Sequence, residues 1–137
     1  MLVVDDEAAI RALVAKIIER VGFVVDTARD GREAIEKLQA AEYDVLVIDL
    51  MMPNVDGYGV IDFLRERGGS QPAVILVTAA DSAAVRRMDG TLVHSVLRKP
   101  FDIDVLADLI SAAAQTMRRE HAADGGTLLS FPERGSC

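Results

Sequence analysis

The sequence predicts an α/β fold with a doubly wound parallel sheet, built from five strand–helix units in succession. Short runs of β-favouring apolar residues alternate along the chain with segments whose apolar residues recur at helical spacing. The runs are uninterrupted, which is typical of strands covered on both faces, and several end in a polar or charged residue. The length of 137 residues suits one domain with one hydrophobic core.

The first two units precede the central strand. Leu2–Val4 is a short apolar strand, and the amphipathic helix after it is expected to end at Gly22. Phe23–Val25 should lead the second strand. Asp30 and Glu33 have capping-box spacing, with Asp in place of the usual Ser or Thr, and indicate the start of a second helix. The apolar positions of the two helices are Ile10, Leu13, Val14, Ile17, Ile18 and Val21, then Ala34, Ile35, Leu38 and Ala41.

The remaining three units follow the same plan. Their strands are predicted at residues 45–48, 73–77 and 95–97. The helix after the third strand is short and is broken by Gly68, Gly69 and Pro72, and the helix after the fourth strand is weak, around Ala83–Met88. The last helix has apolar residues at Ile103, Leu106, Leu109, Ile110, Ala113 and Met117.

The chain is expected to divide into one domain, residues 1–119, and a flexible C-terminal tail, residues 120–137. From about Arg118 the sequence is polar and contains glycine, with too few apolar residues for another core. The single cysteine, Cys137, allows no internal disulfide, and neither a membrane span nor a signal peptide is apparent. We therefore expect a cytoplasmic protein, either a single-domain protein or a domain of a longer one.

The charge balance argues against two classes of partner. The formal net charge is −7, and no basic face with interleaved aromatic residues reverses that sign. Direct binding to nucleic acid or to an anionic membrane is therefore not expected.

Polar side chains stand at the carboxyl ends of the predicted strands. Asp5 and Asp6 follow the first strand, and Asp49 follows the apolar run of the third. Thr78 ends the fourth strand and Lys99 follows the fifth. Because open parallel sheets bind ligands beyond the carboxyl ends of their strands, we expect these residues to converge on one rim.

Carboxylates gathered at such a rim repel one another, by about 4 kcal/mol for a pair ~4 Å apart at an effective dielectric of ~20. A divalent cation removes this repulsion. All-oxygen ligands suit Mg²⁺, or Mn²⁺, and the absence of His and Cys from these positions argues against zinc.

A carboxylate beside Mg²⁺ can act as a nucleophile toward phosphorus. Lys99 would neutralise charge on the phosphoryl oxygens, the Thr78 hydroxyl could donate to a second oxygen, and the backbone N–H of Ala79 could reach a third. The product would be an acyl phosphate on Asp49.

The motifs that carry these residues resemble the receiver domain of two-component response regulators. They are "LVVDDE" at residues 2–7, "VIDLMMPNVDG" at 47–57, Thr78-Ala79, and "LRKPF" at 97–101. The resemblance extends from Leu2 to about Met117 and preserves the order and spacing of the motifs. It implies a flavodoxin-like strand order, 2-1-3-4-5.

The resemblance also implies a role for each residue of the rim. Asp49 would be the phosphoacceptor, with Asp6 and Asp49 as direct Mg²⁺ ligands and Asp5 acting through a metal-bound water. The further roles are a ligand carbonyl at Met51, a phosphate counter-ion at Lys99, a hydroxyl at Thr78 that moves when phosphate arrives, and a cis Lys99–Pro100 peptide.

The function implied is a signalling switch that accepts a phosphoryl group from a histidine kinase or a histidine phosphotransfer protein. Such a domain catalyses its own phosphorylation and dephosphorylation without turning over an external substrate. Its changed surface would be read by an unknown downstream protein, with phosphorylation-linked dimerisation left open. The family's usual aromatic switch residue, three positions before the lysine, is Val96 here, so ring rotation cannot transmit the signal unchanged.

Two other functions stay open at this point. One is a receiver-like interaction module that is never phosphorylated. The other is a Mg²⁺-dependent phosphatase with an aspartyl-phosphate intermediate, which is disfavoured because Leu50-Met51, and not a second acid two residues later, follows Asp49.

Overall fold

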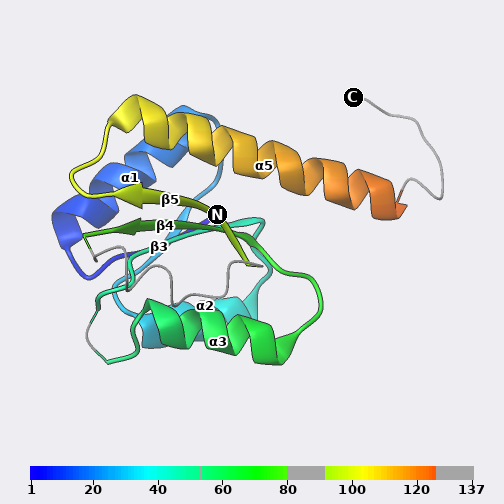
Figure 1. The fold of residues 1–137 in the computed structure, drawn as a ribbon, viewed down its shortest axis with the longest axis horizontal. Helices are drawn as coiled ribbons and strands as arrows, with labels where there is room; N and C mark the ends of the chain where they lie inside the picture. The colour runs from blue at the N-terminus through cyan, green and yellow to red at the C-terminus, as the bar shows by residue number, and fades with distance from the viewer. Residues whose placement is uncertain (53, 80–91, 126–137) are drawn as a thin grey trace.

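The structure, a computed structural model, describes residues 1–52, 54–79 and 92–125 (Figure 1). Five parallel strands form one sheet in the order β2-β1-β3-β4-β5, which confirms the expected fold class and strand order. The strands are β1 (Leu2–Val4), β2 (Asp26–Ala28), β3 (Val45–Ile48), β4 (Ala73–Thr78) and β5 (Val93–Arg98). The described helices are α1 (Ala8–Arg20), α2 (Gly31–Ala40), α3 (Gly57–Arg67) and α5 (Ile103–Gly125).

The helices cover both faces of the sheet, with α1 and α5 on one side and α2 and α3 on the other (Figure 1). Alternate residues of the central strand serve the two cores: Leu46 and Ile48 pack with α2 and α3, whereas Val45 and Val47 pack with α1 and α5. This two-sided burial explains why the strand has no polar alternation in its sequence. Each face buries its own cluster of aliphatic side chains.

The second strand lies later in the chain than expected. We predicted that Phe23–Val25 would lead it, but β2 begins at Asp26, whose residue partner in β1 is Leu2. The Phe23 N–H instead donates to the Ile18 carbonyl (3.2 Å) and closes the end of α1 after Gly22, which has φ +94°. Val24 is 85% exposed. Phe23 and Val25 instead pack, partly buried, against the core cluster that includes α1, so their apolar character reflects this packing and not strand pairing.

Two C-terminal elements are longer than the sequence indicated. β5 extends over Val93–Arg98 where 95–97 was expected, and α5 continues to Gly125, beyond the predicted domain end at residue 119. The fourth helix predicted around Ala83–Met88 lies outside the described residues. Among the residues that the structure describes, no helix is long and apolar enough to cross a membrane.

The loop that follows β3 is fastened to the start of α2. The Gly31 N–H donates to the Val55 carbonyl (3.0 Å), and a side chain at Gly31 would overlap that carbonyl oxygen. Asn54, with φ +65°, donates from Nδ2 to Asp30 Oδ2 (3.1 Å). Because this loop begins at Asp49, directly after β3, its contacts with α2 help to position the Asp49 carboxylate.

The N-cap predicted at α2 is confirmed, but the reciprocal hydrogen bond reaches the residue before the cap and not the cap residue itself. Asp30 is the N-cap, and its Oδ1 accepts a hydrogen bond from the Glu33 N–H (2.9 Å). Glu33 Oε1 in turn accepts from the Arg29 N–H (2.8 Å). The hydrogen bond from Glu33 lowers the pKa of Asp30.

We expect Asp30→Ala to lower the free energy of unfolding by about 1 kcal/mol at neutral pH, because it removes the N-cap acceptor. Asp30→Asn keeps an acceptor and is the matched control, with a smaller loss. A depressed folded-state pKa contributes stability above the unfolded-state pKa, and this contribution is lost as pH falls through the folded-state value. The difference between wild type and Asp30→Asn should therefore shrink below about pH 4. Urea denaturation across this range measures it, and a pH-independent difference would contradict the assignment.

Candidate functional site

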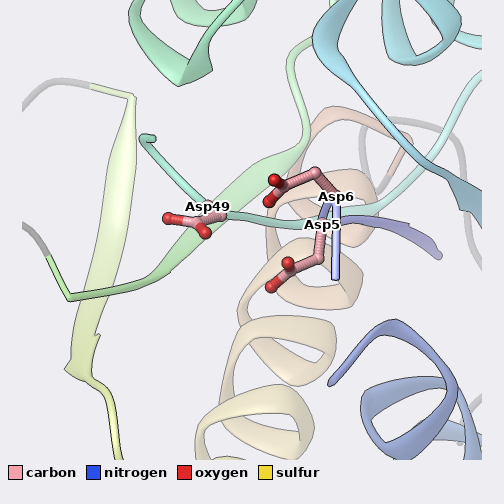
Figure 2. Close-up of side chains that lie close together, drawn as sticks. All are labelled: Asp5, Asp6 and Asp49. Carbon is pink, nitrogen blue, oxygen red and sulfur yellow. The ribbon is translucent and has the colours of Figure 1, made fainter. Parts of the chain in front are cut away.

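Three carboxylates lie together at the carboxyl end of the sheet. Asp5 and Asp6 directly follow β1, and Asp49 directly follows β3 (Figure 2). The two strands are neighbours, and the Asp49 N–H donates to the Val4 carbonyl (3.1 Å), which brings the strand ends level. One oxygen from each carboxylate lies within 4.8 Å of the others. The predicted convergence of these three residues is confirmed.

Lys99 supplies the positive charge of the site. Its Nζ lies 3.0 Å from Asp5 Oδ2 and 3.0 Å from Asp49 Oδ2, so one ammonium bridges both carboxylates. The three side chains are only 13%, 5% and 7% exposed for Lys99, Asp5 and Asp49 respectively. The Lys99 N–H also donates to the Thr78 carbonyl (3.0 Å), which ties the end of β5 to the end of β4. The Lys99–Pro100 peptide is cis, as expected.

Each bridged carboxylate also accepts a hydrogen bond from the backbone N–H of the residue two positions later. Asp5 Oδ1 accepts from the Glu7 N–H (2.9 Å), and Asp49 Oδ1 accepts from the Met51 N–H (3.2 Å). In both residues one oxygen therefore accepts from the amide two residues later and the other accepts from Lys99. This repeated pattern fixes the orientation of the two carboxylates relative to the ammonium.

Burial and charge act in opposite directions on these groups. Burial raises the pKa of Asp5, although the Glu7 N–H and Lys99 both act to lower it. Burial lowers the pKa of Lys99, but its hydrogen bonds with Asp49 and Asp5 outweigh that effect, so its pKa lies above the ordinary value. Lys99 is therefore a permanent cation at physiological pH.

The other predicted residues of the rim are at the same end of the sheet. Thr78 is the last residue of β4 and its side chain is fully buried, whereas Ala79, the next residue, is exposed. Met51 directs its N–H at Asp49, and it is 61% exposed. The N–H contact places Met51 beside Asp49, and the predicted role of its carbonyl as a metal ligand stays a prediction.

Glu7 was not among the predicted site residues. Its Oε1 lies 3.3 Å from Lys99 Nζ, which makes it a third carboxylate partner of the ammonium, and its side chain is 63% exposed. The only signal in the sequence was its place in the acidic run that follows β1. Nothing in that run distinguishes a residue that contacts Lys99, 92 positions away, from one that faces solvent.

The donor set at this edge fits a hard divalent cation. Asp5, Asp6 and Asp49 offer carboxylate oxygens only, the ligand type that Mg²⁺ and Mn²⁺ prefer. Asp6 is exposed, so such a site would be open to solvent on one side. Three carboxylates with one ammonium leave excess negative charge, which favours cation binding.

Comparisons with known proteins find similar sequences. The family model for the response regulator receiver domain matches residues 1–111. Transcriptional regulatory protein TcrA of Mycobacterium tuberculosis is 36% identical over 107 residues, which cover 77% of this chain and 42% of TcrA. Response regulator MprA of Mycolicibacterium vanbaalenii is 35% identical over 127 residues, which cover 91% of this chain and 53% of MprA. The chain thus spans about half the length of these relatives.

Solved structures show the same arrangement of strands and helices. The receiver domain of Francisella response regulator 1452 is similar with a TM-score of 0.75 and 32% identity, covering 84% of this chain and 95% of that one. Chemotaxis protein CheY4 of Vibrio cholerae is similar with a TM-score of 0.73 and 29% identity, covering 82% of this chain and 95% of that one.

We expect Lys99→Met to lower the free energy of unfolding by about 3 kcal/mol at pH 7 without added divalent cation, since it leaves two buried carboxylates uncompensated. Loss of the ammonium raises the folded-state pKa of Asp5 further. Such a group contributes stability at low pH that is lost as pH rises through the folded-state pKa, so the deficit should be largest at neutral pH and smaller in acid.

Chemical denaturation at pH 4 and pH 7 measures this effect. Lys16→Met, at an exposed position of α1, is the matched control and should change stability by no more than about 0.5 kcal/mol. A deficit for Lys99→Met that equals the control would show that the bridging ammonium does not stabilise the fold.

Proposed function

This chain belongs to the response regulator receiver domain family, and we propose that it is a phosphorylation-dependent signalling switch whose phosphoacceptor is Asp49. The observation that carries the proposal is the pair of buried carboxylates, Asp5 and Asp49, that share the Lys99 ammonium beside exposed Asp6. A salt bridge that served only the stability of the fold would not require a third carboxylate, that of Asp6, beside it.

The phosphoryl donor in this proposal is a histidine kinase or a histidine phosphotransfer protein. A carboxylate oxygen of Asp49 attacks phosphorus, the new O–P bond forms, and the P–N bond to the donor imidazole breaks. The imidazole leaves as a neutral base after taking up a proton from solvent. The products are an aspartyl phosphate and the dephosphorylated donor, so a stoichiometric transfer and not turnover is expected.

The residues around Asp49 would align and stabilise the transferred group. Met51 holds one Asp49 oxygen through its N–H, which fixes the orientation of the carboxylate. Lys99 would exchange its contact with Asp49 for one with a phosphoryl oxygen, while the Thr78 hydroxyl and the Ala79 N–H would donate to the others. These contacts would offset charge that develops during transfer.

Asp5, Asp6, Asp49 and the carbonyl of Met51 would hold the Mg²⁺ ion, with Mn²⁺ as a substitute. When bound, the cation supplies positive charge that neutralises the phosphoryl oxygens. The protein's own contribution is the placement of three carboxylates within 4.8 Å of one another on the adjoining ends of β1 and β3. Asp6 is exposed, whereas both oxygens of Asp5 and of Asp49 already accept hydrogen bonds, so Asp6 is the carboxylate most open to direct coordination. Asp49 would release Lys99 from one oxygen when it becomes a ligand.

The output would be a change at the edge of the sheet formed by β4 and β5. Thr78 and Lys99 are linked through their backbones, so movement of either residue alters the strand ends together. Val96 of β5 is 40% exposed and lacks an aromatic ring, so signal transmission would depend on backbone and packing shifts. An unknown downstream protein, or a second phosphorylated copy, would read this surface, and the cytoplasm is the proposed location.

We expect wild-type protein with Mg²⁺ and a small phosphodonor to gain one phosphoryl group, because the carboxylates and Lys99 already assemble the electrostatic site. Intact-mass spectrometry measures the adduct, and Asp49→Asn is the control that should gain none. Failure of the wild type to react would favour a receiver-like module that is never phosphorylated. An equal adduct on Asp49→Asn would move the phosphoacceptor to another residue.

We expect Asp6→Ala to weaken Mg²⁺ binding more than Asp5→Ala, whose loss should be about tenfold, as for residues that act through a metal-bound water. Calorimetric titration gives both affinities. Asp62→Ala, an exposed carboxylate on α3, is the charge control and should bind Mg²⁺ as wild type does. Equal and small losses at Asp5 and Asp6 would remove the proposed ligand set.

A further inference from the structure

Lys99 has three carboxylate partners, and the third differs from the other two in exposure. Its Nζ lies 3.0 Å from both Asp5 and Asp49, which are buried, and 3.3 Å from Glu7, whose side chain is 63% exposed. Asp5 and Asp49 are also the residues proposed to face the cation, whereas Glu7 stands outside that set. The ammonium is therefore shared between the proposed metal ligands and a residue with no other assigned role.

We propose that Glu7 is a positioning residue, which keeps the Lys99 ammonium at the rim when the carboxylates of Asp5 and Asp49 hold the cation. The inference rests on the proposed function. A divalent cation and an ammonium repel each other when both contact the same carboxylate oxygens. Lys99 must therefore give up part of its contact with these oxygens, and Glu7 offers it a partner beside them.

The start of α1 shows that Glu7 is directed at Lys99. Glu7 is the N-cap residue, with extended backbone at φ −85° and ψ 112°, yet its side chain makes no capping hydrogen bond. N-cap side chains normally accept from the first-turn amides, and the shorter Ser, Thr, Asp and Asn do so best. The longer Glu side chain instead extends to Nζ of Lys99.

Local hydrogen bonds make Glu7 the more adaptable partner. Asp5 is anchored by the Glu7 N–H and Asp49 by the Met51 N–H, so neither carboxylate can follow Lys99 without losing a backbone hydrogen bond. The exposed Glu7 side chain can change rotamer as the ammonium moves. The backbone of Glu7 is meanwhile held, because its carbonyl accepts from the Arg11 N–H (2.9 Å).

A double-mutant cycle on Mg²⁺ affinity separates this role from simple attraction between charges. Calorimetry would be run on wild type, Glu7→Gln, Lys99→Met and the double variant. Attraction between Glu7 and the cation predicts the same loss from Glu7→Gln in both backgrounds. Positioning of Lys99 predicts a loss about threefold larger when Lys99 is present, the coupling typical of an exposed ion pair.

Glu7→Asp provides a second test that does not depend on the folding of Lys99→Met. It keeps the charge but shortens the side chain by one methylene, and it can cap α1. We expect its Mg²⁺ affinity to fall toward that of Glu7→Gln, even if α1 becomes more stable. Glu19→Gln, at an exposed position on the same helix, controls for net charge and should leave the affinity unchanged.

Equal losses from Glu7→Gln in both backgrounds, or wild-type affinity in Glu7→Asp, would overturn the inference. In that case the proposed function stands as long as wild type binds Mg²⁺ and Asp49 is phosphorylated. A wild type that neither binds Mg²⁺ nor accepts a phosphoryl group would instead remove the proposed function, and this inference with it.

Discussion

The bridge from Lys99 to Asp5 and Asp49 is the interaction on which the arrangement of this domain's functional edge depends. Two carboxylates that are nearly buried side by side repel each other and lose hydration, which destabilises the fold unless a cation compensates them. The Lys99 ammonium does so here, and Lys99 follows β5, an edge strand of the sheet. The ends of β1, β3 and β5 are therefore held by a single charged group.

This dependence explains how a local chemical change could reach a distant surface. Any group that competes for Asp5 and Asp49, or that adds negative charge to Asp49, changes the partners available to Lys99. Lys99 is hydrogen-bonded through its backbone to Thr78, so its rearrangement acts on the ends of both β4 and β5. In the proposed switch, a change in the charges at the rim thus changes the geometry of the sheet edge formed by β4 and β5.

Backbone contacts elsewhere in the fold hold the carboxylates of the site in place. The loop after Asp49 is fastened to α2 through Gly31 and Val55, where a larger residue than glycine would not fit. Asp5 and Asp49 each accept a hydrogen bond from the backbone N–H of the residue two positions later. Carboxylates anchored by backbone amides, facing an ammonium at the end of a long side chain, suit a site in which the cationic partner, and not the anionic ones, changes place.

Local patterns in the sequence determined the elements whose burial is regular. The apolar run at β3 predicted a strand covered on both faces. Because such a strand has no solvent face, the run also predicted that the Asp49 carboxylate lies at the carboxyl end of the strand. The Asp30–Glu33 spacing predicted the cap of α2 for a similarly local reason, since both partners lie within one helical turn. The rule that ligands bind at the carboxyl ends of parallel strands then grouped Asp5, Asp6, Asp49, Thr78 and Lys99.

Contacts between distant segments decided the rest. The strand order was predicted from family resemblance and not from periodicity, because periodicity says nothing about which strands pair. Phe23–Val25 had the composition of a strand, but the closing turn of α1 and the register with Leu2 placed β2 three residues later. The contact of Glu7 with Lys99 joins residues 92 positions apart. Only the folded sheet brings them together, because the reach of an exposed side chain toward a distant partner leaves no periodic trace in the sequence.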